Sequence, residues 1–298
     1  MPDWIAELVV DEELARRLLA QFPDLEVTSL RPFAEGWDYT IWLVDETWAF
    51  RFPRREMVVP GVIREIAVLP ELAPGLPIPV PEPVFVGRAT DDFPWPFFGS
   101  ALLPGRELGE AELDDDGRIE VGRMLARFLR RLHQAEVAYA LPMDANRRAD
   151  MSVRVPKTRE QLGELEATGI WRCPPLVDAL LDDAEDLPPS TVSAVVHGDL
   201  HFRQVLVGTD RTLTGVIDWV DVCRSDPAID LSMVWSYLPP EGREPFLSDY
   251  GRVTDDQLLR ARVVALSLSA ALALYGSREG FPSIEQEALL GLERAAMG

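Results

Sequence analysis

The hydrophobic pattern of the chain changes its period at Pro104-Gly105, and this change restricts the fold more than any other feature of the sequence. Before that point, apolar residues form short runs and alternations separated by turn-forming residues, as β-strands do. After it, apolar residues recur with the spacing of amphipathic helices. The sequence therefore predicts two lobes, residues 1–104 and residues 105–298, that differ in secondary structure.

The first lobe is expected to be built around antiparallel strands. Residues 25–53 contain apolar stretches separated by turn-prone segments, which predicts a meander. Seven prolines between residues 73 and 97 favour an extended chain after it. The expected elements are an amphipathic helix at 3–21, strands within 25–53, a helix at 61–72, and strands at 84–86 and 97–103.

The second lobe is expected to be mainly helical. Its clearest element is the segment 117–135, where apolar residues form one stripe and charged residues cover the rest. The segment 144–189 is polar and less regular, so we expect it to supply specificity elements instead of core. The other expected elements are strands at 192–196, 205–207 and 213–217, and helices at 230–237, 255–275 and 284–297.

Charge excludes several classes of partner. The chain carries 50 acidic against 29 basic side chains, a formal charge of −21. Nucleic acids and anionic membrane surfaces are bound through concentrated Lys and Arg, so neither partner is expected.

Lys157 is the only lysine and follows Pro156. A P-loop needs Gly-Lys-Ser/Thr, so that class of nucleotide enzyme is excluded as well.

Compartment and membrane signals point to the cytoplasm. The two cysteines, Cys173 and Cys223, have no CxxC spacing, so neither a disulfide framework nor a structural zinc site is expected. The N-terminus lacks the pattern of an export signal. The longest apolar run, 263–275, is shorter than the ~20 residues that a spanning helix needs, which predicts a buried helix.

A dense polar cluster at 197–204 lies between two apolar strands, and Asp218 follows the next strand. Phosphoryl transfer needs a carboxylate that orients the acceptor hydroxyl and further oxygen ligands that hold Mg2+ on the phosphates. Asp199, Gln204 and Asp218 supply these groups. Their order matches the protein-kinase pattern of a catalytic Asp, an amide five residues later and a subsequent metal-binding Asp.

Three motifs carry a more specific resemblance: His197-Gly198-Asp199-Leu200-His201, Ile217-Asp218-Trp219, and the segment from Asp226 to Leu231. Together they resemble the aminoglycoside phosphotransferase family, which includes macrolide and other small-molecule kinases. The resemblance covers most of the chain. It implies an α+β, bilobal, protein-kinase-like fold, in which the first lobe has an antiparallel sheet and one helix and the second is larger and mainly helical.

The resemblance also implies an activity. The γ-phosphoryl group of ATP or GTP would pass to a hydroxyl of an aminoglycoside, a macrolide or a similar small molecule. Asp199 would be the catalytic base, and Asp218 would bind Mg2+ with Gln204, which stands where the family usually has Asn. Asp230 would pin the catalytic loop, and His197 is expected to brace it.

In the first lobe the resemblance implies the nucleotide contacts. Glu35 and Gly36 would belong to a loop over the phosphates. Arg51 would contact the phosphates and form an ion pair with Glu65. Ser100 to Leu103 would form the hinge, whose backbone binds the purine edge, with Ser100 and Leu102 as contact residues.

Two other functions fit the same residues. His197, Asp199 and His201 alternate, and on a strand they would form a two-His, one-carboxylate site of a metal-dependent hydrolase. A catalytically degenerate kinase fold that only binds nucleotide is the second, because Gln204, Tyr39 and Arg51 depart from common choices in the family. Magnesium-dependent turnover separates both from an active kinase.

Overall fold

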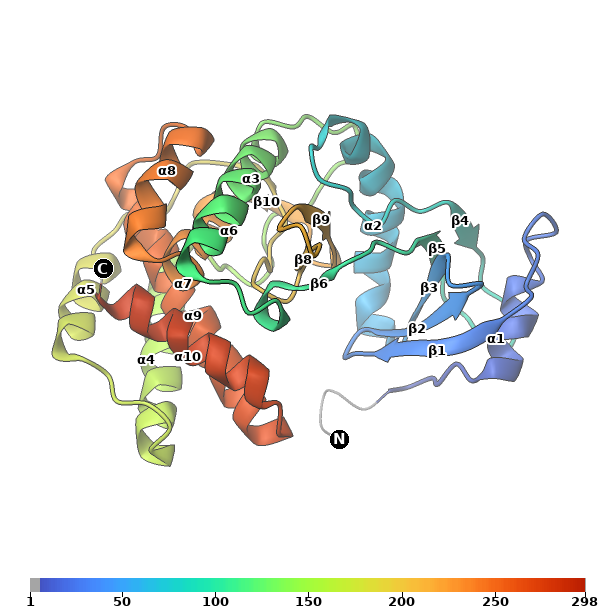
Figure 1. Ribbon diagram of the computed structural model, residues 1–298, viewed down its shortest axis with the longest axis horizontal. Helices are drawn as coiled ribbons and strands as arrows, with labels where there is room; N and C mark the ends of the chain where they lie inside the picture. The colour runs from blue at the N-terminus through green and yellow to red at the C-terminus, as the bar shows by residue number, and fades with distance from the viewer. Residues whose placement is uncertain (1–5, 298) are drawn as a thin grey trace.

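The computed structural model describes residues 6–297 and has two parts that lie side by side, with the N-terminal sheet at the right of Figure 1 and a helical part at the left. The sheet is antiparallel, with the strand order β1-β2-β3-β5-β4. The architecture is mixed α+β, as predicted. The elements of the N-terminal part are α1 (Glu12–Leu19), β1 (Leu30–Glu35), β2 (Tyr39–Val44), β3 (Trp48–Pro53), α2 (Val59–Leu72), β4 (Phe85–Gly87) and β5 (Phe97–Ala101).

Aromatic side chains form the core of this sheet. Phe50, Phe52 and Phe97 are fully buried, and the Phe52 and Phe97 rings lie 4.8 Å apart between centroids. The helix α1 is shorter than expected, because Asp11 accepts a hydrogen bond from the Leu14 N–H at 2.8 Å and starts the helix at residue 12. Residues 3–5 of the expected helix lie outside the described part of the chain.

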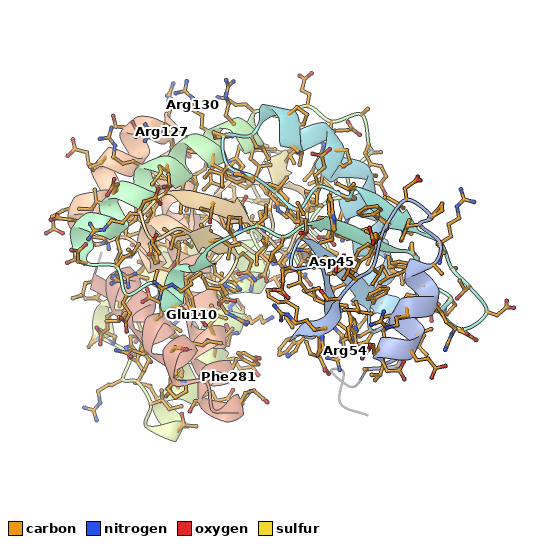
Figure 2. All side chains as sticks on the ribbon, turned by 45° about the vertical axis from the view of Figure 1, so that its right-hand side comes forward. Asp45, Arg54, Glu110, Arg127, Arg130 and Phe281 are labelled. Atoms are coloured by element: carbon orange, nitrogen blue, oxygen red, sulfur yellow. The ribbon has the colours of Figure 1, made fainter. Side chains whose placement is uncertain are left out.

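The C-terminal part contains two small sheets, β10-β7 and β6-β8-β9, surrounded by helices. Its central helix α3 buries Leu125, Phe128 and Leu129, whereas Arg127 and Arg130 project outward (Figure 2). The elements are β6 (Arg106–Glu107), α3 (Asp115–His133), α4 (Met151–Thr168), α5 (Pro175–Glu185), β7 (Ala194–Val196), β8 (Val205–Val207), β9 (Leu213–Val216), β10 (Cys223–Ser225), α6 (Ala228–Leu231), α7 (Met233–Ser236), α8 (Pro240–Tyr250), α9 (Asp255–Glu279) and α10 (Pro282–Met297).

The prediction that segment 144–189 adds little to the core was wrong. It forms α4 and α5, which bury Val155, Leu165 and Leu181 in the main hydrophobic cluster. Apolar residues are sparse in α4 and separated by polar and charged ones, so its sequence gives a weak helical pattern, and α5 is short and interrupted by acidic residues. The helix α8 was not expected either, and it begins directly after Pro239.

The helix α9 is longer than the apolar run within it. Thr254 and Gln257 form a capping box, which sets the start of the helix at Asp255. Within residues 6–297 it is the one helix long and apolar enough to cross a membrane by length and composition, but 67% of its most apolar window is buried inside the protein. The expectation that the segment is too short was therefore wrong, whereas the expected buried helix is observed.

The two parts share core packing at α2. Its residues Val68, Leu69 and Leu72 belong to the same hydrophobic cluster as Leu125 and Phe128 of α3. The start of the same helix lies against the loop after β9, where a Cβ on Gly61 would come 2.3 Å from the Val220 side chain. The helix therefore joins the sheet to the C-terminal part, and a lobe boundary at residue 104 remains a prediction.

Candidate active site

The predicted catalytic loop, 197–204, lies between β7 and β8. The carboxylate of Asp230, on α6, accepts hydrogen bonds from the backbone N–H groups of His197 at 2.8 Å and Gly198 at 3.1 Å. His133 Nε2 lies 3.0 Å from the same carboxylate. Burial disfavours the charged form of Asp230, but the hydrogen bond and charge of His133, with contributions from His197, hold its pKa below the ordinary value.

His197, at the start of the loop, is also held by contacts with the segment after β9. His197 Nε2 lies 2.9 Å from the carbonyl oxygen of Ile217, and the imidazole packs on Trp219 with 4.7 Å between ring centroids. Gly198 has a φ of +95°, and a Cβ there would lie 2.4 Å from the carbonyl oxygen of Asp221. Only glycine fits this close approach, so the backbone that carries Asp199 is narrowly defined.

The structure brings Gln204 and Asp218 together. The backbone N–H of Ile217 donates to the backbone carbonyl oxygen of Gln204 at 2.8 Å, and the side-chain Nε2 of Gln204 lies 3.4 Å from Asp218 Oδ2. Asp218 has a φ of +66°, a left-handed conformation that is uncommon outside glycine. Gln204 Oε1 is buried and has no hydrogen-bond partner among residues 6–297.

The unpartnered Gln204 Oε1 shows whether these residues fit Mg2+. A buried amide oxygen without a partner costs free energy, and a hard cation beside it would remove that cost. The neighbouring Asp218 carboxylate is the other ligand type that Mg2+ prefers. Gln204 and Asp218 therefore fit a magnesium site.

The Asp199 carboxyl group opens to solvent, with 37% of its side chain exposed. Burial of the rest of the side chain raises its pKa to about 7, opposed by the charge of Arg148 and reinforced by those of Asp221, Asp218 and Asp38. The charge of Asp218 acts on Asp199, so the predicted base and the predicted metal ligand lie within electrostatic range of each other. A carboxyl group with a pKa near neutrality is suited to general-base catalysis.

The arrangement contradicts the hydrolase alternative. No group of three His, Cys, Asp or Glu side chains in residues 6–297 is placed to hold a metal ion. Both ring nitrogens of His197 are engaged, Nε2 by Ile217 and Nδ1 by the Asp199 N–H at 3.4 Å. His201 Nε2 lies 3.9 Å from Asp199 Oδ2, and burial lowers the pKa of His201, so its imidazole is neutral. The residues occupy a loop instead of a strand.

The expected ion pair between Arg51 and Glu65 is not formed in the described structure. Arg51, on β3, donates to the Ser100 hydroxyl at 2.7 Å. Glu65, on α2, instead accepts from the Tyr39 hydroxyl and from the Trp219 N–H at 3.1 Å. Burial raises the pKa of Glu65 to about 7. The phenol of Tyr39 satisfies the carboxyl group that would otherwise bind the guanidinium.

The predicted phosphate loop is the turn between β1 and β2. The Gly36 N–H donates to the Tyr39 carbonyl oxygen at 2.9 Å, which closes the turn. Glu35 forms an ion pair with Arg54 at 2.6 Å on the exposed side. The Asp38 carboxylate accepts from Arg55 at 2.7 Å, and its charge acts on Asp199. The turn therefore brings a carboxylate within electrostatic range of Asp199.

The predicted hinge follows β5. Ser100 is fully buried, and its hydroxyl serves Arg51. The Leu102 N–H donates to the Thr47 carbonyl oxygen at 2.8 Å, so this group is not available to a purine. Purine binding at the hinge would have to use other backbone groups of this segment.

Sequence reasoning missed Arg148, which lies directly at the site. Its guanidinium is 2.9 Å from Asp144, 3.1 Å from Asp221 and 3.9 Å from Asp199. It comes from the loop before α4, where neither a motif nor a periodic pattern distinguishes it from the neighbouring Arg147.

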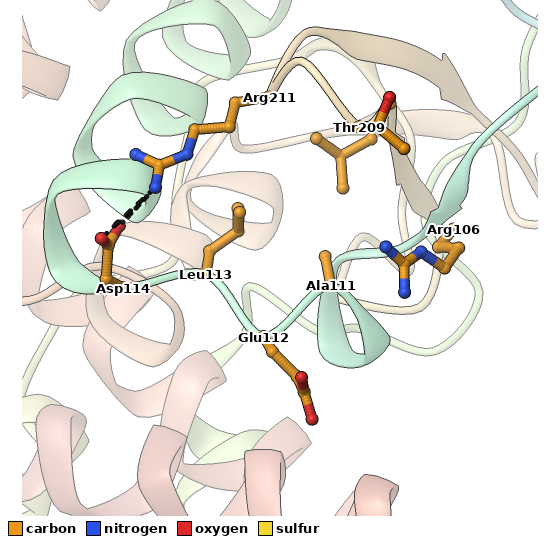
Figure 3. A pocket seen from close by; sticks show the side chains of 9 residues that line it. Arg106, Ala111, Glu112, Leu113, Asp114, Thr209 and Arg211 are labelled. Carbon is orange, nitrogen blue, oxygen red and sulfur yellow. Dashed lines mark hydrogen bonds and ion pairs between the residues drawn. The ribbon is translucent and has the colours of Figure 1, made fainter.

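A cavity of about 240 Å³ lies elsewhere, where β6 and the turn after it meet the turn between β8 and β9 (Figure 3). Arg211 on its wall is paired with Asp114 at 3.3 Å. None of its nine lining residues belongs to the predicted site. The cavity is therefore separate from the predicted site.

The fold and the loop geometry together define a kinase-like phosphotransferase. The sequence model of the phosphotransferase enzyme family matches residues 29–263, and the chain belongs to this family. It is thereby classed with enzymes that transfer phosphoryl groups to hydroxyl groups of small molecules. No curated protein matches the chain in sequence.

Solved structures share the fold. The GDP and kanamycin complex of APH(2")-IIIa has a TM-score of 0.71 and 24% identity, over 96% of this chain and 98% of that one. The GDP complex of wild-type aminoglycoside 2'-phosphotransferase-IIIa has a TM-score of 0.69 and 24% identity, over 96% and 99%. Macrolide 2'-phosphotransferase MphH from Brachybacterium faecium has a TM-score of 0.61 and 24% identity, over 92% and 96%.

Proposed function

We propose that the protein transfers the γ-phosphoryl group of ATP or GTP to a hydroxyl of an aminoglycoside, a macrolide or a similar small molecule. Two observations of one arrangement carry this proposal: the Gln204 amide lies beside Asp218 with its Oε1 buried and unpartnered, and the Asp199 carboxyl group opens to solvent. One cation ligand pair and one accessible base are what phosphoryl transfer requires of the protein.

In the proposed mechanism Asp199 accepts the proton of the acceptor hydroxyl as that oxygen attacks the γ-phosphorus, and the bond from the γ-phosphorus to the bridging oxygen breaks and releases the nucleoside diphosphate. Gln204 and Asp218 would hold Mg2+, which neutralises charge on the phosphates. The loop is rigid because Asp230 holds two of its N–H groups, so Asp199 does not need to reorganise. Arg51, oriented by Ser100, would add positive charge on the nucleotide side.

The candidate acceptors are aminoglycosides, macrolides, sugars, amino alcohols and other hydroxyl-bearing metabolites. The net charge of −21 favours a cationic aminoglycoside, whereas Gln204 in place of the family's usual Asn favours a macrolide. Solved structures with the same fold include a kanamycin complex and a macrolide phosphotransferase. Two free cysteines support action in a reducing cytoplasm.

A degenerate kinase is the competing function. Gln204 and Arg51 depart from common family choices, and Tyr39 is committed to Glu65. Such a protein would bind nucleotide without turnover.

The test is a panel of hydroxyl-bearing compounds incubated with Mg2+ and either ATP or GTP, read by the mass of the product. A gain of one phosphoryl group that disappears in Asp199→Ala supports the kinase. Tight nucleotide binding without product from any acceptor supports the degenerate protein. Asp210→Ala, in the exposed turn after β8, is the matched control and should behave as the wild type.

A further inference from the structure

An arginine outside every recognised motif connects three carboxylates at the base of the site. Arg148 Nη1 lies 2.9 Å from Asp144 Oδ1, and Nη2 lies 3.1 Å from Asp221 Oδ2 and 3.9 Å from Asp199 Oδ1. Only 13% of the arginine side chain is exposed. A guanidinium has a fixed planar fork, so contacts on both arms restrict its position.

The guanidinium is itself held in place by local structure. The Asp144 N–H donates to the Arg224 carbonyl oxygen at 3.1 Å, which ties the loop to β10. The Asp144 carboxylate in turn accepts from the backbone N–H groups of Asn146 at 3.0 Å and Arg148 at 2.5 Å. The loop therefore presents Arg148 in one orientation before any ligand binds.

The second arm reaches the catalytic loop along two routes. Asp221 contacts Arg148 through its side chain, and its backbone carbonyl packs against Gly198, the residue before the base. Arg148 also approaches the Asp199 carboxylate directly. A chain of contacts thus runs from Asp144 through Arg148 to both sides of the base.

We infer that Arg148 is a positioning residue for phosphoryl transfer: it fixes the carboxylate of Asp199 in the orientation that receives the acceptor proton. This inference rests on the proposed function. Arg148 binds neither nucleotide nor metal in this assignment, because both arms of its guanidinium are engaged by protein carboxylates. Its removal leaves the base free to rotate toward solvent.

The charges around Asp199 give the inference a second readout. Asp38, Asp218 and Asp221 act on it with negative charge, burial lowers the pKa of His201, and Arg148 opposes the three acids with its positive charge. Loss of Arg148 should raise the pKa of Asp199, so the acidic limb of the kcat/KM profile should move to higher pH by about one unit. Asp221→Asn should move the same limb to lower pH.

The experiment compares Arg148→Met, Arg148→Lys and the matched control Arg147→Met. Arg147 is 59% exposed and its guanidinium pairs with Asp150 on the surface, so its replacement should change nothing. We expect kcat to fall about 100-fold in Arg148→Met, the loss that misplacement of a catalytic group by about 1 Å produces. The KM for nucleotide should stay within about twofold, and Arg148→Lys should recover the pH limb and part of kcat.

The inference is overturned if Arg148→Met keeps kcat within about twofold of the wild type. It is also overturned if kcat falls while the pH limb stays in place, because a merely structural role would do that. Should the wild type turn over no acceptor, the proposed function fails, and the inference is then decided by a 13C NMR titration of the Asp199 carboxyl carbon. A higher pKa of Asp199 in Arg148→Met than in the wild type supports the contact between Arg148 and Asp199, and an equal pKa refutes it.

Discussion

Replacement of Asp230 by Asn should destabilise the protein and loosen the catalytic loop. The carboxylate has no exposed surface and accepts from two backbone N–H groups at 2.8 and 3.1 Å, with His133 Nε2 at 3.0 Å. Asparagine keeps the shape but turns one acceptor oxygen into an NH2 group that faces a donor. One hydrogen bond to a charged group is worth roughly 1.5–3 kcal/mol, and the unpaired donor costs a further 1–3. We expect a loss of about 3 kcal/mol.

The assay is equilibrium unfolding in urea, followed by circular dichroism. The control is Asp182→Asn, because Asp182 is 73% exposed and its pair with Arg159 is a surface contact worth under about 1 kcal/mol. Phosphoryl transfer should be lost in Asp230→Asn even where the protein remains folded. A destabilisation below about 1 kcal/mol, equal to that of the control, would refute the anchoring role of Asp230.

The pH dependence of the free energy of unfolding tests the same contact. The pKa of Asp230 lies below its ordinary value, so its carboxylate stabilises the fold fully above pH ~4 and less as the pH falls through the folded-state pKa. The amide of the Asp230→Asn variant does not titrate, so the stability difference between wild type and variant should shrink below pH ~4. A difference that stays constant down to pH 2 would contradict the depressed pKa.

The remaining predictions concern two other buried carboxyl groups. The pKa of Glu65 is raised to about 7, so the folded state keeps a proton on this carboxyl group that the unfolded state loses. The free energy of unfolding of the wild type should therefore fall, relative to that of Glu65→Gln, as the pH rises from 4.5 to 7. A difference between the two proteins that stays constant across that range would contradict this. Glu287 forms a buried bidentate ion pair with Arg118 at 2.6 and 2.7 Å. Glu287→Gln should lower the free energy of unfolding, measured in urea, by about 3–5 kcal/mol. Glu13→Gln, in an exposed ion pair, is the control and should lower it by less than about 1 kcal/mol.

The sequence was most informative where chemistry requires contiguous residues. Asp199 and Gln204 lie in one loop between two apolar strands, and Asp218 ends the next strand, so their convergence follows from local structure. The amphipathic pattern of α3 was equally clear because its apolar stripe is wide. The α+β, two-part architecture followed from these signals.

Contacts that depend on packing between distant segments were not predictable in the same way. The Tyr39 hydroxyl reaches Glu65 because the β2–β3 register places the ring beside α2, and this displaced the expected partner Arg51. His133 reaches Asp230 across 97 residues, a contact that no local pattern indicates. Arg148 had no signal at all, since it stands beside another arginine in a polar loop.

The central claim is that the carboxylates of residues 199 and 218 act at one site with a divalent cation. The most direct test is the rate of product formation by Asp218→Asn as Mg2+ is titrated, with folding checked by circular dichroism. We predict a folded protein whose turnover is undetectable at every Mg2+ concentration that saturates the wild type. Turnover within about tenfold of the wild type would contradict the metal assignment and, with it, the account of the active site.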